Sequence, residues 1–172
     1  MLLLLKTFLE IGMWRKGPQD LPASRALTWF VFVVYIAIEL VRIRLFNLDL
    51  RSAAIIAAVD VLMLSLWLWL VLAFFGHRHR FVQTITATLG VGVLILSLDI
   101  LVRVTQLATG FSETLLRDWL LIRFFILALI MGRIFMHAIE RGLMTGMALT
   151  IAIIYSTEAV AQLMLNNLKA VP

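Results

Sequence analysis

Five long apolar stretches, separated by short polar or basic segments, dominate the pattern of hydrophobic and polar positions along this chain. They cover residues 25–46, 52–75, 81–102, 118–137 and 143–166. An α-helix rises about 1.5 Å per residue and the hydrocarbon core of a bilayer is roughly 30 Å thick, so each stretch is long enough to cross it. The pattern predicts an all-α fold: an integral membrane bundle of five transmembrane helices in a single domain over residues 1–172.

The third stretch has the most informative periodicity. Its first 22 residues carry no full charge except Asp99. Its polar and small residues recur at helical steps of four or seven, with a last step of three: Thr84, Thr88, Gly92, Asp99, Arg103 and Gln106. Threonine and glycine let a neighbouring helix approach closely, and a lipid-facing helix has no use for such a stripe. We therefore expect this helix to lie inside the bundle, with Gly90 and Gly92 serving helix packing.

The first 14 residues form a different kind of apolar segment. One helical face carries Leu2, Leu5, Leu9 and Met13, and another carries Lys6 and Glu10. An amphipathic helix of this kind lies in the membrane interface rather than across the bilayer. The segment lacks the basic start and the small-residue cleavage site of a signal peptide. After it, Pro18 and Pro22 interrupt any helix, and Ser24 is placed to cap the first spanning helix.

The composition supports the membrane class and excludes several kinds of chemistry. Hydrophobic residues make up 63% of the chain and the mean hydropathy is +1.04, whereas roughly half of a soluble domain is apolar. Cysteine is absent from the sequence, which excludes disulfides, thiol catalysis and thiolate metal sites. The net charge of +5 reflects loop lysines and arginines that orient the helices. The expected partner is the lipid bilayer, and no nucleic-acid partner is expected.

Five spans place the two chain ends on opposite sides of the membrane, and the basic residues indicate which side is which. Eight lysines and arginines fall on the N-terminal side and seven on the other side. The segment up to the start of the first span alone carries four, whereas several of the seven are candidates for buried partners of acids. Basic loops stay in the cytoplasm, so we expect a cytoplasmic N-terminus.

Charged residues inside the predicted spans gather at one level. Spans one, three and five run outward from the N-terminal side, and two and four run back. The half of the membrane away from the N-terminus therefore contains Glu39, Asp60, Asp99, Arg123 and Glu158, with Arg42 and Arg103 one turn nearer the far surface. On the fifth span Tyr155 and Gln162 share the face of Glu158, and on the first Tyr35 shares the face of Glu39 and Arg42. We expect these two faces together to line one cavity.

Three arrangements would reduce the cost of these charges. Each unpaired charge near the bilayer centre costs roughly 2.5–3.5 kcal/mol, so four unpaired acids would cost on the order of 10 kcal/mol. One arrangement is an ion-pair network that locks the five helices together. Another is a polar cavity that binds an ion, a proton or a lipid head group. In the third, the acids reach the far interface, which is easiest for Glu39 and Glu158.

Asp99 is the acid for which the pattern predicts most. It is four residues from Arg103, so the two side chains can meet on one helical face. Arg123 lies at the same level on the next span. We predict that Asp99 is ionised, is paired with Arg103 or Arg123, and lies within reach of Asp60 or Glu158.

Three histidines lie on the N-terminal side. His77 and His79 share the loop at residues 76–80, and His137 ends the fourth span. Two histidines at i and i+2 with a third nearby are candidate metal ligands, although the pattern favours a solvated basic loop near anionic lipid heads. The sequence contains no phosphate-binding loop, catalytic triad or metalloprotease motif. We expect no cofactor, no resident metal and no enzymatic activity.

Two short segments resemble a known family. The sequence GHRHRFVQT, residues 76–84, joins a glycine and basic residues to F-x-Q-T at the head of the third span, and PQDLPAS, residues 18–24, precedes the first span. Together with the five-span layout, these segments resemble the Yip (Ypt-interacting protein) family and its small bacterial relatives. In eukaryotic members a long cytosolic N-terminal region engages small GTPases and trafficking factors. For bacterial relatives the resemblance implies chiefly a fold.

Two functions are therefore open. The resemblance implies a non-enzymatic, Yip-like protein of the bacterial inner membrane that organises membrane or partner proteins, together with a membrane-protein partner or a second copy of the chain. The alternative is a small transporter or channel subunit that uses the acidic and arginine layer to bind an ion, a proton or a lipid head group. Uptake into liposomes that requires Asp99 would favour the alternative. A stoichiometric partner without uptake would favour the organising role.

Overall fold

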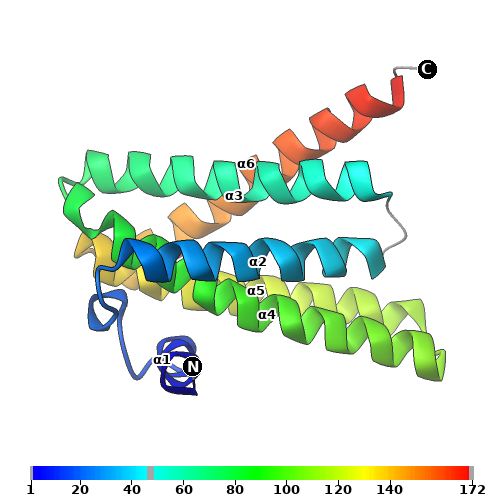
Figure 1. Cartoon of the computed structure of the whole chain (residues 1–172), viewed down its shortest axis with the longest axis horizontal. Coiled ribbons are helices and arrows are strands. Elements are labelled where there is room, and N and C mark those ends of the chain that lie inside the picture. The colour runs from blue at the N-terminus through cyan, green and yellow to red at the C-terminus, as the bar shows by residue number, and fades with distance from the viewer. Residues whose placement is uncertain (1, 46–48, 171–172) are drawn as a thin grey trace.

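The computed structural model describes residues 2–45 and 49–170, with side chains for 4–45, 49–112 and 114–166. Along this part of the chain the elements are α1 (Leu2–Gly12), η1 (Pro18–Asp20), α2 (Arg25–Leu45), α3 (Leu50–Phe74), η2 (Arg78–Arg80), α4 (Phe81–Thr109), α5 (Glu113–Ile139) and α6 (Leu143–Ala170) (Figure 1). The described residues contain no strand. Helices α2 to α6 are each long and apolar enough to cross a bilayer, which confirms the predicted all-α bundle.

Polar side chains cap the starts of α2 and α3. The Ser24 hydroxyl accepts a hydrogen bond from the Leu27 amide at 3.3 Å, as expected. The Asp49 carboxylate accepts one from the Ser52 amide at 3.0 Å, which satisfies an amide at the helix start. Hydrogen bonding from the side chain and the amide of Ser52 lowers the pKa of Asp49, because it stabilises the charged form. Phe46, the predicted end of the first span, lies outside the described residues.

Helices α4 and α5 extend furthest beyond the predicted spans. Helix α4 continues to Thr109 rather than ending at residue 102, and α5 begins at Glu113 rather than at residue 118. The predicted spans end where the apolar residues end, but a helix satisfies its own backbone groups and continues into polar sequence until a residue stops it. Gly110 stops α4 with a φ of 67°, a left-handed conformation that glycine adopts at little cost.

Helix α4 is the central helix of the bundle. In its apolar window 61% of the residues are buried, whereas the other four spanning helices have 17–28% buried. It contacts α1, α2, α3 and α5. The hydroxyl groups of Thr86 and of Thr28 on α2 form a hydrogen bond at 2.6 Å. Thr84, Thr88 and Gly92 are all buried, so the prediction that this face lies inside the bundle is confirmed.

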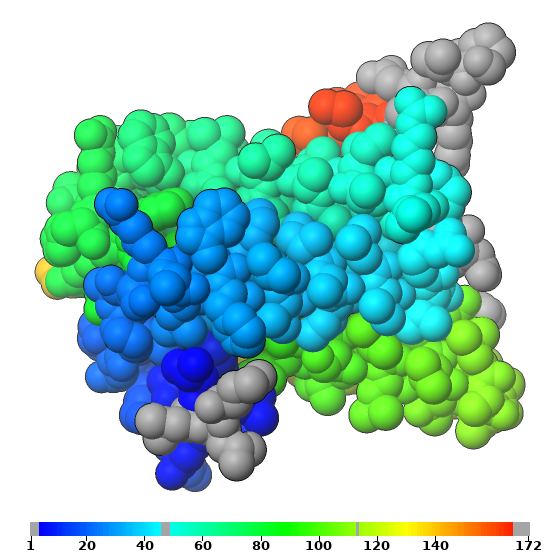
Figure 2. Space-filling model, in the orientation of Figure 1, coloured from blue at the N-terminus to red at the C-terminus, as the bar shows by residue number. Residues whose placement is uncertain are grey.

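Helices α5 and α6 cross at a pair of glycines. A Cβ atom added to Gly146 would overlap the carbonyl oxygen of Gly132, and a Cβ atom on Gly132 would lie 2.9 Å from the amide nitrogen of Met147. Glycine at both positions permits this backbone-to-backbone approach. Beyond the crossing, α6 runs diagonally past α3, and its C-terminal half leaves the body of the bundle (Figure 1, Figure 2). Helix α6 is therefore held tightly near its start and diverges from the other helices towards its end.

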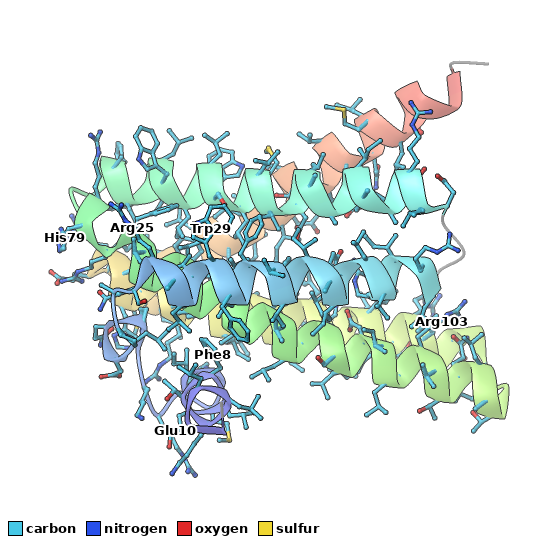
Figure 3. The ribbon with its side chains drawn as sticks, in the orientation of Figure 1. Phe8, Glu10, Arg25, Trp29, His79 and Arg103 are labelled. Carbon is cyan, nitrogen blue, oxygen red and sulfur yellow. The ribbon has the colours of Figure 1, made fainter. Side chains whose placement is uncertain are left out.

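Helix α1 lies crosswise to the bundle. It is seen end on in the view in which the five long helices run across the picture (Figure 1). Phe8 points from α1 toward the bundle and Glu10 points away from it (Figure 3). The Phe8 ring lies over Gly90 of α4, where an added Cβ atom would collide with the ring. A crosswise helix with an apolar inner face has the geometry expected of an interfacial segment.

Candidate functional site

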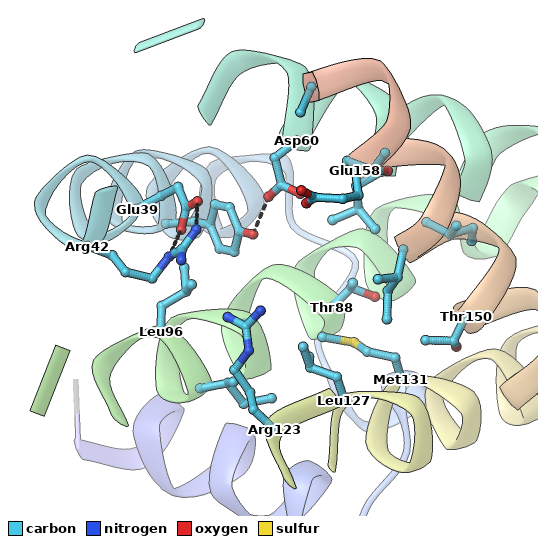
Figure 4. Close-up of a pocket in the computed structure, with 18 of the residues that line it drawn as sticks. Glu39, Arg42, Asp60, Thr88, Leu96, Arg123, Leu127, Met131, Thr150 and Glu158 are labelled. Atoms are coloured by element: carbon cyan, nitrogen blue, oxygen red, sulfur yellow. Dashed lines mark hydrogen bonds and ion pairs between the residues drawn. The ribbon is translucent and has the colours of Figure 1, made fainter. Parts of the chain in front are cut away.

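A cavity of about 210 Å³ lies within the bundle and is lined by residues of all five spanning helices (Figure 4). At roughly 30 Å³ per molecule, it has room for about seven waters. Its charged lining residues are Glu39 and Arg42 of α2, Asp60 of α3, Arg123 of α5 and Glu158 of α6. The structure thus brings five residues of the predicted polar layer to one space, although they come from four different helices.

Glu39 and Arg42 form an ion pair on α2. The Nε and Nη2 atoms of Arg42 donate to the two carboxylate oxygens of Glu39 at 2.9 and 2.5 Å. The three-residue spacing puts both side chains on one helical face. Glu39 is only 2% exposed, and this two-point contact balances its charge. The pair therefore adds little net charge to the cavity.

Asp60 has a neutral partner. The Tyr35 hydroxyl donates to Asp60 Oδ2 at 2.5 Å, which links α2 to α3. The Tyr35 ring lies against Gly92 of α4, where an added Cβ atom would come within 2.7 Å of it. Gly92 therefore provides the room that lets Tyr35 reach Asp60. This is a packing role for one glycine of the predicted stripe.

Asp99 is buried and pairs with Arg123. The Nη1 atom of Arg123 donates to Asp99 Oδ2 at 2.5 Å, and Trp119 Nε1 donates to Oδ1 at 2.9 Å. Both donors belong to α5, so Asp99 ties α4 to α5. Asp99 is not one of the cavity-lining residues; it affects the cavity by neutralising Arg123, which does line it. Trp119 was missed by the sequence analysis; its four-residue spacing from Arg123 was the available signal.

Arg103, the other predicted partner of Asp99, bonds elsewhere. Its guanidinium donates to the carbonyl oxygen of Leu45 at 3.3 Å and to the side-chain oxygen of Gln106 at 2.5 Å. Leu45 is the last residue of α2, where backbone carbonyls lack helical partners and the helix dipole favours a cation. Asp99 is meanwhile satisfied by two donors from α5. Of the two predicted partners of Asp99, the structure therefore pairs it with Arg123 and not with Arg103.

The predicted face of α6 is only partly at the cavity. Tyr155 is 65% exposed and packs its ring on Phe124 at 6.0 Å, and Gln162 is also exposed. Neither residue lines the cavity, so the prediction that they do is wrong. The face of α6 that does line it carries Thr150, Ile153, Ile154, Thr157, Glu158 and Ala161. Sharing a helical face with Glu158 was an insufficient criterion, because Glu158 lies at the margin of the inward face.

The two ion pairs leave Asp60 and Glu158 as the unbalanced charges of the cavity. Asp60 is bonded to a tyrosine hydroxyl, and Glu158 accepts a hydrogen bond from the Gln162 side-chain amide at 3.0 Å. Within the described ranges, neither carboxylate makes an ion pair. Figure 4 shows both carboxyl groups turned toward the same region of the cavity. Ionised, they give the cavity an excess of negative charge.

Two buried polar atoms at the cavity have no hydrogen-bond partner among the described residues. They are Arg123 Nε and Thr157 Oγ1, and both residues line the cavity. Leaving a buried donor or acceptor unsatisfied costs about 1–3 kcal/mol. Each atom therefore has an unused capacity for a hydrogen bond beside the cavity. Thr157 was not predicted, because a threonine in an apolar span carries no distinguishing pattern.

The other end of the cavity is apolar. Leu127, Met131 and Phe135 line it from α5, and with Arg123 they form a row at four-residue steps. This row was the signal that could have identified them, because four-residue steps follow one helical face. Thr88 is also at this end (Figure 4), but its hydroxyl donates to the Thr84 carbonyl of its own helix at 2.8 Å. The cavity therefore has a charged end and a hydrocarbon end.

The predicted histidine positions lie outside this cavity. The rings of His77 and His79 are 6.1 Å apart. In the part of the chain that the structure describes, no group of three His, Asp or Glu side chains could hold a metal ion, so His77, His79 and His137 do not form the candidate site. Instead Arg80 donates to the Glu140 carboxylate and to the His137 carbonyl oxygen, the latter at 3.0 Å. The Arg80 hydrogen bond lowers the pKa of Glu140, because the guanidinium stabilises the carboxylate.

No match to this chain was found among protein-family models, curated proteins or solved structures. The chemistry of the cavity is therefore the basis for its function.

Proposed function

We propose that this integral membrane protein binds a cation in the cavity among its five spanning helices and moves it through the membrane, as a small transporter or channel subunit does. One observation carries the proposal: Asp60 and Glu158 face the same cavity and, among the described residues, form no ion pair. A carboxylate at membrane depth costs roughly 2.5–3.5 kcal/mol, and a like charge nearby adds to that cost. A bound cation offsets both.

The two ion pairs support a cation site. Arg42 is committed to Glu39 and Arg123 to Asp99, each through bonds of 2.5 Å. These commitments keep both arginines from neutralising Asp60 and Glu158. A cavity with fixed negative charge and low-dielectric walls attracts cations and repels anions. The proposal involves no chemical step, in keeping with a non-enzymatic protein.

Uptake into proteoliposomes tests this proposal. We expect saturable uptake of radiolabelled methylammonium by the full chain, and loss of that uptake in Asp60→Asn, which keeps the side-chain size but removes the charge. Glu140→Gln is the matched control, because Glu140 lies outside the spanning helices and bonds to Arg80. Uptake that is absent from the parent, or equal in Asp60→Asn and the parent, would overturn the proposal.

The orientation that we propose has the N-terminus in the cytoplasm of a bacterial inner membrane. Arg42 and Arg123 line the cavity and are not loop charges. Without them the far side keeps five lysines and arginines against eight on the N-terminal side. An excess of basic residues marks the cytoplasmic side.

A Yip-like organising role is the second candidate, and one contact favours it. The Gln83 side chain donates to the Leu21 carbonyl oxygen at 2.8 Å. This bond joins the two segments, residues 18–24 and 76–84, on which the family resemblance rests. They therefore build one shared surface at the N-terminal end of the bundle. A stoichiometric membrane-protein partner that is lost in Gln83→Leu, together with no uptake by the parent, would favour this role over transport.

A further inference from the structure

The cavity separates charge from hydrocarbon along its length. Asp60 and Glu158 lie together at one end, whereas Leu127 and Met131 lie at the other (Figure 4). A ligand that fills the whole space must therefore present a charged group to one end and an apolar group to the other. A ligand lacking either part would leave carboxylates unpaired or apolar surface against water.

The charged end matches a primary ammonium group. Such a group has three N–H donors and no acceptor, as the lysine side chain does. Asp60 and Glu158 supply two acceptors, and the buried Thr157 hydroxyl, which has no partner among the described residues, supplies a third. One –NH3⁺ group has a donor for each of these three acceptors, and it offsets one of the two carboxylate charges.

Other ligand classes fit less well. A phosphate or carboxylate needs a cationic end, but both arginines at the cavity are neutralised by Glu39 and Asp99. A proton or a bare metal ion occupies a small part of about 210 Å³ and leaves the apolar end in contact with water. An uncharged amphiphile leaves the carboxylates without a counterion.

The route into the cavity also suits an amphiphile. Glu158 lines the cavity, is exposed, and belongs to α6, the helix that diverges from the bundle (Figure 1). An exposed acid at the cavity can receive an ammonium group that enters beside this helix. Amphipathic ammonium compounds concentrate in bilayers with their charge near the interface and their hydrocarbon inside.

We propose that the cavity takes an amphipathic primary ammonium, with the –NH3⁺ group on Asp60, Glu158 and Thr157 and the hydrocarbon group against Leu127 and Met131. This inference rests on the proposed function, because it assigns the substrate class of the same cavity. It predicts that hydrocarbon length governs affinity as much as charge does.

Calorimetric titration of the full chain in nanodiscs tests the assignment. The probes are methyl-, propyl- and hexylammonium, with hexanol as the uncharged analogue and empty nanodiscs as the background. Each added methylene should tighten Kd about fourfold until the apolar end is full. Asp60→Asn should weaken every ammonium about tenfold or more, and hexanol should bind no better than it does to empty nanodiscs.

A second variant separates the inference from the proposed function. Leu127→Trp adds bulk at the apolar end, so the gain in affinity from methyl- to hexylammonium should be smaller than in the parent. A cooperative thermal melt shows that the variant is folded. Methylammonium binding with no dependence on chain length would overturn the inference and leave the proposed function standing. Hexanol binding as tight as hexylammonium would also overturn the inference. If no ammonium binds at all, both fail.

Discussion

Replacing Asp99 with alanine would leave Arg123 as an uncompensated charge inside the bundle. Asp99 is 5% exposed and accepts one bond from Arg123 at 2.5 Å and another from Trp119 at 2.9 Å. Removing one member of a buried pair typically costs ~3–5 kcal/mol. The Arg123 side chain is 25% exposed and faces the cavity, where water can solvate it, so we expect the lower end of that range. For a chain of this length, about 3 kcal/mol lowers Tm by about 6–12 °C.

The reciprocal change should cost more. Arg123→Met leaves the more deeply buried partner, the Asp99 carboxylate, with only the Trp119 indole as a donor, so we expect about 4 kcal/mol. The double variant removes both charges together. It should therefore be more stable than the sum of the single effects predicts, by about 2 kcal/mol.

Thermal unfolding of the parent, the two single variants and the double variant in one detergent measures this coupling. The matched control pairs Asp99→Ala with Arg103→Met, because Arg103 bonds to Gln106 and to the Leu45 carbonyl. We expect a coupling of less than about 0.5 kcal/mol in the control. The reasoning fails if the Arg103 coupling equals the Arg123 coupling, or if Asp99→Ala melts like the parent.

Three further predictions concern helix packing, topology and pH. Gly146→Ala should lower the free energy of unfolding by about 1–3 kcal/mol through overpacking, and so lower Tm. The matched Gly142→Ala should leave Tm unchanged, because a Cβ atom on Gly142 meets nothing within 4 Å. Equal Tm values for the two variants would contradict the helix crossing. Single cysteines at Gln19 and Ser112, in a chain without native cysteine, should react with an impermeant thiol reagent from opposite sides of the membrane, and labelling from one side would rule out the topology. The lowered pKa of Glu140 means that its bond to Arg80 stabilises the fold above the ordinary carboxyl value near 4.5 and is lost as pH falls through the folded-state pKa. The Tm difference between the parent and Glu140→Gln should therefore shrink between pH 7 and pH 4, and a constant difference would refute the link.

The depth of the polar layer could be predicted from the sequence, because depth in the membrane is proportional to residue number along a spanning helix. Each residue advances about 1.5 Å along the helix, so the span direction and the position within the span suffice to place a charge. Glu39, Asp60 and Arg123 were placed in this way, and the structure puts them around one cavity. The central position of α4 followed from its stripe of small residues for a similar reason, because small side chains are where other helices can approach.

The rotation of a helix about its axis could not be read in the same way. The face that α6 turns inward depends on its contact with α5 at Gly132 and Gly146, which joins two helices rather than neighbours in sequence. Tyr155 and Gln162 were consequently assigned to the cavity that they do not line. The same limit applies to ion pairs: spacing identified Arg103 as a partner of Asp99, but a spacing rule sees only contacts within one helix.

The contact of Phe8 with Gly90 also has a consequence for biosynthesis. The two residues are about 80 positions apart, and a ribosome adds roughly 5–20 residues per second, so the surface that receives Phe8 emerges about 4–16 seconds after Phe8 itself. During that interval the apolar face of α1 has no α4 to cover it, and the lipid interface is the surface that can shelter it. Helix α1 is therefore synthesised early but can pack against the bundle only after α4 has been inserted. Slower translation between residues 12 and 81 would lengthen the time that this helix waits at the membrane surface.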